Sequence, residues 1–149
     1  MIKVLFICHG NICRSVMAEY MFRDMVLRTG REGDFEIASR ATSREEIGSD
    51  MYPPAKRCLT GHGVPFGHHS AAQVTRQACE DCDYLVCMDE WNVQNMRRMF
   101  GHDYDEKTFK LLDLTPLKRD VADPWYTGDF EQTYRDLSLG CEALLKKLG

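Results

Sequence analysis

The segment from Cys8 to Ser15 combines residue types that could displace a phosphoryl group. It opens with a cysteine and closes with Arg14 and Ser15. Free cysteine is mostly a thiol at neutral pH, but a helix N-terminus and a nearby cation stabilise the nucleophilic thiolate. The planar guanidinium of Arg14 can hold two phosphoryl oxygens at once, and the Ser15 hydroxyl could donate a hydrogen bond to the Cys8 sulfur. The spacing therefore predicts phosphoryl transfer through a cysteinyl-phosphate.

Two residues inside this segment suit a loop that closes around an anion. Gly10 allows the backbone to approach the anion closely, and Asn11 tolerates a left-handed backbone conformation. A strand that feeds such a loop and then a helix N-terminus gathers unpaired backbone N–H groups at one point. We therefore expect a bound phosphate or another oxyanion there.

Displacement of a phosphate ester also needs an acid for the leaving oxygen, and the segment from Asp123 to Tyr126 supplies a candidate. Pro124 keeps the preceding residue out of helical conformation, so Asp123 can project from a stiff loop. Asp123 would protonate the leaving group and then, as a base, activate water. Trp125 and Tyr126 offer an aromatic wall for a planar substrate group.

The elements that must position these groups alternate between strand and helix. Continuous apolar runs and partly alternating patterns predict strands at 4–7, 35–39, 84–88 and 109–112. Helical spacing predicts helices at 15–28, 54–62, 90–100 and 130–148, with a short helical piece ending at residue 78. Such alternation favours an α/β fold, a parallel sheet covered by helices on both faces.

Ligands of such sheets bind beyond the carboxyl ends of the strands. Cys8, Ser39, Asp89 and Asp113 all fall at that edge in the predicted arrangement. Asp89 would either hold the loop of Asp123 or cap the helix that follows.

Composition sets the remaining limits. The chain has 149 residues, 44% of them hydrophobic, and lacks an obvious linker, so we expect one domain over 1–149. The net charge of −4 does not favour nonspecific nucleic-acid binding. No stretch approaches the roughly 20 apolar residues of a membrane span.

Seven irregularly spaced cysteines favour reduced thiols and a cytoplasmic location over a disulfide framework. We expect a monomer, with a weak dimer as the alternative.

Taken together, the segment Cys8-His9-Gly10-Asn11-Ile12-Cys13-Arg14-Ser15 and the segment from Asp123 to Tyr126 resemble the low-molecular-weight protein tyrosine phosphatase family. The resemblance covers nearly the whole chain. It implies a three-layer α/β/α fold with a four-stranded parallel sheet, in a phosphatase-I-like, Rossmann-like architecture. It also implies hydrolysis of phosphotyrosine in proteins and of aryl phosphates in two steps, with neither metal nor cofactor. Cys8 would be the nucleophile, Arg14 the phosphate clamp, Ser15 the thiolate donor and Asp123 the acid and base.

The resemblance also implies a supporting histidine and exposes departures from the family. In the family a histidine supports the loop asparagine, and His69 fits that position better than His68. His9 stands where leucine is usual, and Ala72 where an arginine is common. Glu45 replaces an aromatic residue on the wall facing the Asp-Pro loop, so we expect it to repel acidic phosphopeptides at the rim.

Two other reactions remain alternatives. Arsenate reductases of the same fold pair a loop cysteine with further redox cysteines, a role that Cys79 and Cys82 could fill with Cys8. Some relatives with altered cleft residues prefer phosphoarginine. A zinc site made of Cys79, Cys82 and upstream histidines is disfavoured, because the spacing is irregular and no second close cysteine pair completes four ligands.

Cys13 adds a redox prediction, since the family often forms a reversible disulfide between the cysteines at positions 8 and 13. Such a bond would protect Cys8 from irreversible oxidation. Mild peroxide should abolish activity and added thiol should restore it in the wild type. The Cys13→Ala variant should recover less activity in the same assay, and equal recovery would contradict the protective role.

Overall fold

The apolar run that precedes Cys8 forms a central strand of a parallel sheet. The computed structural model describes all residues, 1–149, and contains four strands: β1 (Ile2–Cys8), β2 (Phe35–Ala41), β3 (Tyr84–Cys87) and β4 (Thr108–Lys110). They lie in the order β2-β1-β3-β4, and every pairing is parallel. The predicted four-stranded parallel sheet is confirmed.

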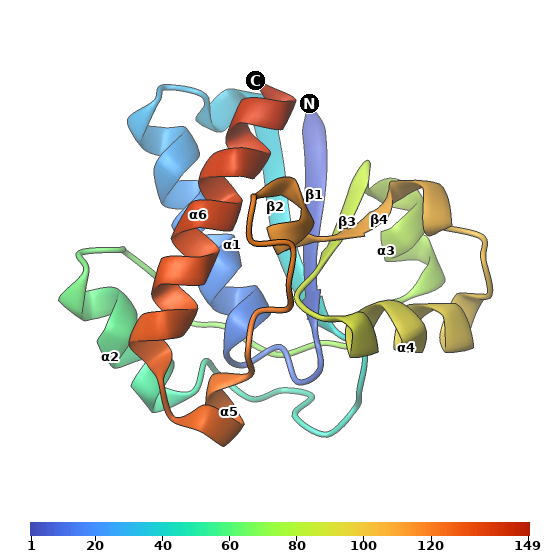
Figure 1. The fold of residues 1–149 in the computed structure, drawn as a ribbon, viewed down its shortest axis with the longest axis horizontal. Coiled ribbons are helices and arrows are strands. Elements are labelled where there is room, and N and C mark those ends of the chain that lie inside the picture. The colour runs from blue at the N-terminus through green and yellow to red at the C-terminus, as the bar shows by residue number, and fades with distance from the viewer.

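Helices cover both faces of this sheet (Figure 1). They are α1 (Arg14–Arg28), α2 (Pro53–Gly61), α3 (Arg76–Asp81), α4 (Glu90–Phe100), α5 (Pro124–Thr127) and α6 (Phe130–Leu148). Helices α1, α2 and α6 lie on one side of the sheet, and α3 and α4 on the other. None of the helices is long and apolar enough to cross a membrane. The three-layer α/β/α arrangement is therefore as predicted.

The alternation of side chains along β1 explains why both faces are covered. Val4, Phe6 and Cys8 belong to the larger apolar core, together with residues of α1 and α6. Leu5 and Ile7 point to the other face and pack with residues of α3 and α4. Successive side chains of a strand point to opposite faces of the sheet, so a central strand needs apolar residues at every position.

Three segments differ from the sequence-based expectation. The short helical piece expected to end at residue 78 is α3, which runs over Arg76–Asp81 because Thr75 caps its start. The last strand ends at Lys110, and Leu111–Leu114 form a 3₁₀ turn instead of extending it. This turn buries Leu111 against Gly140 of α6, where any side chain in place of the glycine would overlap Leu111. Close packing of the helix therefore outweighs the strand propensity of the segment. The segment after Asp123, predicted as a loop, also contains the short helix α5.

Candidate active site

The loop between β1 and α1 wraps around the sulfur of Cys8. The backbone N–H groups of Asn11 and Ser15 point at Cys8 Sγ, with N···S distances of 3.3 and 3.4 Å. Ser15 Oγ lies 3.0 Å from the same sulfur. Asn11 has a φ of 60°, the left-handed conformation that an asparagine tolerates and that turns its N–H inward. Three donors thus converge on one sulfur at the start of a helix, an environment that stabilises a thiolate.

The side chain of Asn11 is fixed by partners of known polarity. The backbone N–H of Ala72 donates to Asn11 Oδ1 at 3.2 Å, which assigns the amide nitrogen to the other side. That nitrogen donates to Ser39 Oγ at 2.9 Å, and the Ser39 hydroxyl donates to the Glu19 carboxylate at 2.6 Å. All these side chains are buried, apart from that of Ala72, which takes part only through its backbone. The orientation of the amide is therefore dictated by the surrounding fold.

This orientation leaves the Ser15 hydroxyl free to donate to a Cys8 thiolate. The Asn11 amide also donates to Ser15 Oγ at 2.9 Å. Because the Ser15 oxygen accepts from Asn11, its own hydrogen is free to point at Cys8 Sγ. A thiolate at Cys8 is then the acceptor of this bond.

His69 binds the loop at Asn11, as expected for the supporting histidine. Its Nε2 lies 2.7 Å from the backbone oxygen of Asn11 and must be the protonated nitrogen, because a carbonyl only accepts. The backbone N–H of His69 is held by Asp50 Oδ1 at 3.0 Å. His68 is largely exposed and makes no contact with the loop. The histidine therefore contacts the backbone of Asn11, while Ala72 contacts its side chain.

Arg14 is buried and gripped from three directions. Its guanidinium donates to Asp89 Oδ2 at 2.7 Å, to the backbone oxygen of Val121 at 2.8 Å and to Asp123 Oδ2 at 3.4 Å. Burial lowers the pKa of Arg14, but the negative charges of Cys8, Asp89 and Asp123 outweigh that effect and hold its pKa above the ordinary value. The guanidinium is thus a fixed cation beside the sulfur.

Asp89 caps α4, which is one of the two roles that the sequence offered, and its second contact is with Arg14 and not with the loop of Asp123. As the cap, Asp89 accepts a hydrogen bond from Asn92 N at 2.8 Å, while Asn92 Oδ1 accepts from the backbone N–H of Asp89. The other carboxylate oxygen faces Arg14. The cap therefore fixes the carboxylate that aims the guanidinium, a function that the sequence pattern alone did not reveal.

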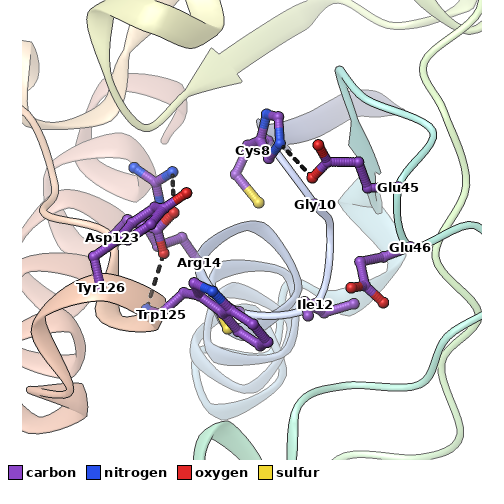
Figure 2. Close-up of a pocket in the computed structure, with 11 residues that line it drawn as sticks. Cys8, Gly10, Ile12, Arg14, Glu45, Glu46, Asp123, Trp125 and Tyr126 are labelled. Carbon is purple, nitrogen blue, oxygen red and sulfur yellow. Dashed lines mark hydrogen bonds and ion pairs between the residues drawn. The ribbon is translucent and has the colours of Figure 1, made fainter.

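The sulfur lies at the bottom of a pocket with two different walls (Figure 2). Asp123, Trp125 and Tyr126 form one side, and Glu45 and Glu46 the other. Asp123 Oδ1 accepts from the backbone N–H of Trp125 at 3.0 Å, so the start of α5 holds this carboxylate in place. Tyr126 is 82% exposed and stands at the mouth. The candidate nucleophile, clamp, acid and aromatic wall therefore share one pocket.

Tyr52 does not line the pocket but supports the aromatic wall, a contact that the sequence analysis missed. Its ring packs on Trp125 with centroids 4.7 Å apart, and on Phe130 at 6.1 Å. Tyr52 also donates its backbone N–H to the Ile12 oxygen at 2.9 Å. The ring thus links the phosphate loop to the aromatic wall. Its only sequence signal was an aromatic residue before Pro53, which predicts packing at a helix start but no partner.

The two departures His9 and Glu45 contact each other. His9 Nε2 lies 2.8 Å from Glu45 Oε2, and both side chains are substantially exposed. The pair joins the loop of Cys8 to the 42–51 segment across one side of the pocket. The unusual residues therefore act together at the rim, which their separate positions in the sequence did not indicate.

Of the other cysteines named in the sequence analysis, Cys13 shares the pocket of Cys8, whereas Cys79 and Cys82 lie outside it. Cys13 lines the pocket, but burial, together with the charges of Cys8 and Asp123, raises its pKa well above that of a free thiol. Cys79 is fully buried on the α3 face of the sheet, where burial raises its pKa to about 11. Neither Cys79 nor Cys82 lines the pocket of Cys8.

One group of side chains elsewhere could hold a metal ion. Cys58, His62 and Glu131 place their ligand atoms within 4.8 Å of one another, between the end of α2 and the start of α6. His62, one of the histidines upstream of Cys79 and Cys82, thus lies beside Cys58 instead of those two cysteines.

A parallel α/β sheet with a cysteine and an arginine cradling one anion site defines a class of phosphate-handling enzymes. Residues 3–149 match the family model described as low molecular weight phosphotyrosine protein phosphatase. The low molecular weight protein-tyrosine-phosphatase YfkJ of Bacillus subtilis (strain 168) is 38% identical over 150 residues, covering 99% of this chain and 96% of the relative. The chain belongs to the low molecular weight phosphotyrosine protein phosphatase family and is a phosphatase.

Solved structures agree with this assignment. The crystal structure of YfkJ superposes with a TM-score of 0.96 at 38% identity, covering 99% of this chain and 94% of that one. The low molecular weight protein tyrosine phosphatase SP-PTP of Streptococcus pyogenes gives 0.91 at 35% identity, covering 100% and 94%. The YwlE arginine phosphatase of Bacillus subtilis gives 0.87 at 26% identity, covering 99% and 95%.

The double role of Asp89 gives a testable prediction. In Asp89→Asn the amide oxygen can still cap α4, but the charge facing Arg14 is lost. We expect the melting temperature to fall, because a buried guanidinium loses its shortest ion pair. We also expect kcat for an aryl phosphate to fall by about ten- to a hundredfold, because Arg14 is no longer held in position. Asp120→Asn is the matched control, since Asp120 lies at the same helix start and pairs with Lys110 but makes no contact with Arg14. An unchanged kcat in Asp89→Asn would show that the Val121 carbonyl and Asp123 suffice to aim Arg14.

Proposed function

We propose that this protein hydrolyses phosphotyrosine in proteins through a cysteinyl-phosphate on Cys8. The observation that supports this most strongly is the convergence of Asn11 N, Ser15 N and Ser15 Oγ on Cys8 Sγ at 3.0–3.4 Å, in a pocket shared with Arg14 and Asp123. A domain that only bound phosphate would need the cradle, but neither an activated sulfur nor a carboxylic acid beside it.

In the first step the phosphate dianion occupies the loop from His9 to Ser15, with Arg14 on its equatorial oxygens. The Cys8 thiolate attacks phosphorus, the bond to the phenolic oxygen breaks, and Asp123 gives its proton to that oxygen. Arg14 meets the charge that spreads over the equatorial oxygens in the transition state. The phenol leaves, and the phosphoryl group stays on Cys8.

In the second step Asp123, now a carboxylate, removes a proton from a water molecule as that water attacks phosphorus. The bond between sulfur and phosphorus breaks, and Cys8 leaves as a thiolate. The hydroxyl of Ser15, oriented by Asn11, donates to the sulfur as the negative charge returns to it. Each group of the pocket thus takes part in both half-reactions without a metal ion or cofactor.

The walls support an aryl phosphate as the substrate. Trp125 and Tyr126 line the pocket with aromatic faces against which the ring of a phosphotyrosine can pack. We propose that residues 1–149 act as one domain, as a monomer in the cytoplasm, on phosphoprotein substrates. The buried position of Cys79, away from the pocket, argues against the arsenate reductase alternative, in which that thiol would have to reach Cys8.

Phosphoarginine is the second candidate, and one feature favours it. Glu45 and Glu46 line the pocket, and carboxylates would attract the guanidinium that phosphoarginine releases. The YwlE arginine phosphatase belongs to the same structural group. Glu45, however, is already paired with His9, which leaves less negative charge for a substrate guanidinium.

One turnover assay separates these functions. Phosphotyrosine, phosphoserine, phosphoarginine and arsenate are offered to the protein with a metal chelator present. We expect the highest kcat/KM for phosphotyrosine, and a Cys8→Ser variant that binds phosphate without turnover. Preference for phosphoarginine, or arsenate reduction that is lost in Cys79→Ala or Cys82→Ala, would contradict the proposal.

Asp123 gives the sharpest test of the acid step. Loss of a general acid costs about 10²- to 10⁴-fold when the leaving group is strongly basic. Asp123→Ala and Asp123→Asn should therefore slow phenyl phosphate hydrolysis far more than p-nitrophenyl phosphate hydrolysis. The asparagine variant can still cap α5, so it separates proton transfer from loop structure. Equal slowing of both substrates, or wild-type rates in Asp123→Asn, would show that Asp123 is not the acid.

A further inference from the structure

A second groove adjoins the catalytic pocket on the side of α4. Its lining shares His9, Arg14, Asp123 and Tyr126 with the pocket, so the two hollows are continuous. The groove does not include Glu45 or Glu46. The carboxyl ends of the strands, the start of α4 and α5 lie at the same end of the molecule (Figure 1). A polypeptide whose phosphotyrosine enters the pocket must leave it along some part of this rim.

The wall contributed by α4 is a stripe of three side chains. Trp91, Asn95 and Arg98 are spaced at i, i+4 and i+7, which places them on one face of a helix. Trp91 is 66% exposed, although tryptophan side chains are highly buried on average. Asn95 is half-buried and Arg98 is exposed. The stripe offers an apolar surface, an amide and a cation in one line beside the cleft.

Arg98 differs from the other charged groups of the groove because it has no ionic partner within 4 Å. Arg14 pairs with Asp89 and Asp123, and His9 pairs with Glu45. The neighbouring Arg97 points elsewhere and pairs with Asp105 at 3.2 Å. Arg98 is thus the uncompensated charge of the groove, and it is a cation.

We propose that the groove along α4 binds the polypeptide flanking the phosphotyrosine, with an acidic side chain at Arg98 and an apolar or aromatic side chain on Trp91. This inference rests on the proposed function, because the groove is occupied only when a phosphotyrosine fills the pocket. It refines the expectation drawn from Glu45: acidic residues are disfavoured on the side of Glu45 and Glu46 and favoured on the side of α4.

Two series of phosphotyrosine peptides test the charge preference. Each series carries either Asp or Asn at the flanking positions, on the N-terminal side in one series and the C-terminal side in the other. In one series the wild type should show a kcat/KM ratio of acidic to neutral peptide of about two- to fivefold, the effect of one exposed ion pair, and salt should lower it. Arg98→Ala should abolish that preference, and Arg98→Glu should reverse it.

Arg97→Ala is the matched control, because it removes the same charge from the adjacent position of the helix. It should leave the preference unchanged, and turnover of p-nitrophenyl phosphate should be the same in both alanine variants. A preference that survives in Arg98→Ala, or that falls equally in Arg97→Ala, would overturn the proposal while the phosphatase function stood. A wild type that hydrolyses neither peptide nor p-nitrophenyl phosphate would overturn the proposed function, and this inference with it.

Trp91 gives an independent measurement. Trp91→Ala should raise KM by about two- to tenfold for peptides with an aromatic flanking residue, without changing kcat or the KM of p-nitrophenyl phosphate. Trp91→Phe should restore most of the affinity. An equal rise in KM for peptides with and without the aromatic residue would contradict the contact with Trp91.

Discussion

The site depends on the fixed orientation of one amide, the side chain of Asn11. Its oxygen is occupied by the backbone N–H of Ala72, so its nitrogen must face Ser15 and Ser39. That polarity leaves the hydrogen of Ser15 free to point toward Cys8, so that a Cys8 thiolate can accept from Ser15 as well as from the two backbone N–H groups. Glu19 and His69 hold the ends of this arrangement. Reversing the amide would place a donor against a donor and leave buried groups unpaired, which is costly in a protein interior.

Next to this hydrogen-bond network, the Arg14 guanidinium is held in place by three acceptors. Arg14 is almost completely buried, and a buried guanidinium is tolerated only when paired and hydrogen-bonded. Asp89 meets that need from the start of α4, and the Val121 carbonyl meets it from the chain that leads to Asp123. The same guanidinium also contacts the candidate acid, Asp123, in the pocket that holds the sulfur. Packing of α4 and of the 115–123 segment therefore bears directly on the geometry of the phosphate loop.

The sequence was informative where local chemistry dominates. The apolar run before Cys8, the helix after Ser15 and the alternation of strands and helices gave the parallel sheet, because the side-chain periodicity of buried strands and of helices is a local property. Pro124 likewise predicted that the preceding residue, Asp123, has a restricted backbone and projects its carboxylate from a stiff segment. What could not be foreseen depends on tertiary contacts: the ring of Tyr52 on Trp125, the pair of His9 and Glu45, and the turn at Leu111 that replaces the end of a strand. Each of these contacts joins segments that are far apart in the sequence, and no local sequence pattern indicates that they meet.

The central claim is that the phosphoryl group passes through the sulfur of Cys8. The most direct measurement is acid quenching of Asp123→Asn during turnover of p-nitrophenyl phosphate, followed by peptide mapping with fragmentation that separates Cys8 from Cys13. Loss of the base should slow breakdown of the intermediate, so we predict phosphate on Cys8 and none in the double variant that also carries Cys8→Ala, in which no nucleophile remains at position 8. Phosphate on another residue, or turnover that persists in Cys8→Ser, would contradict the account.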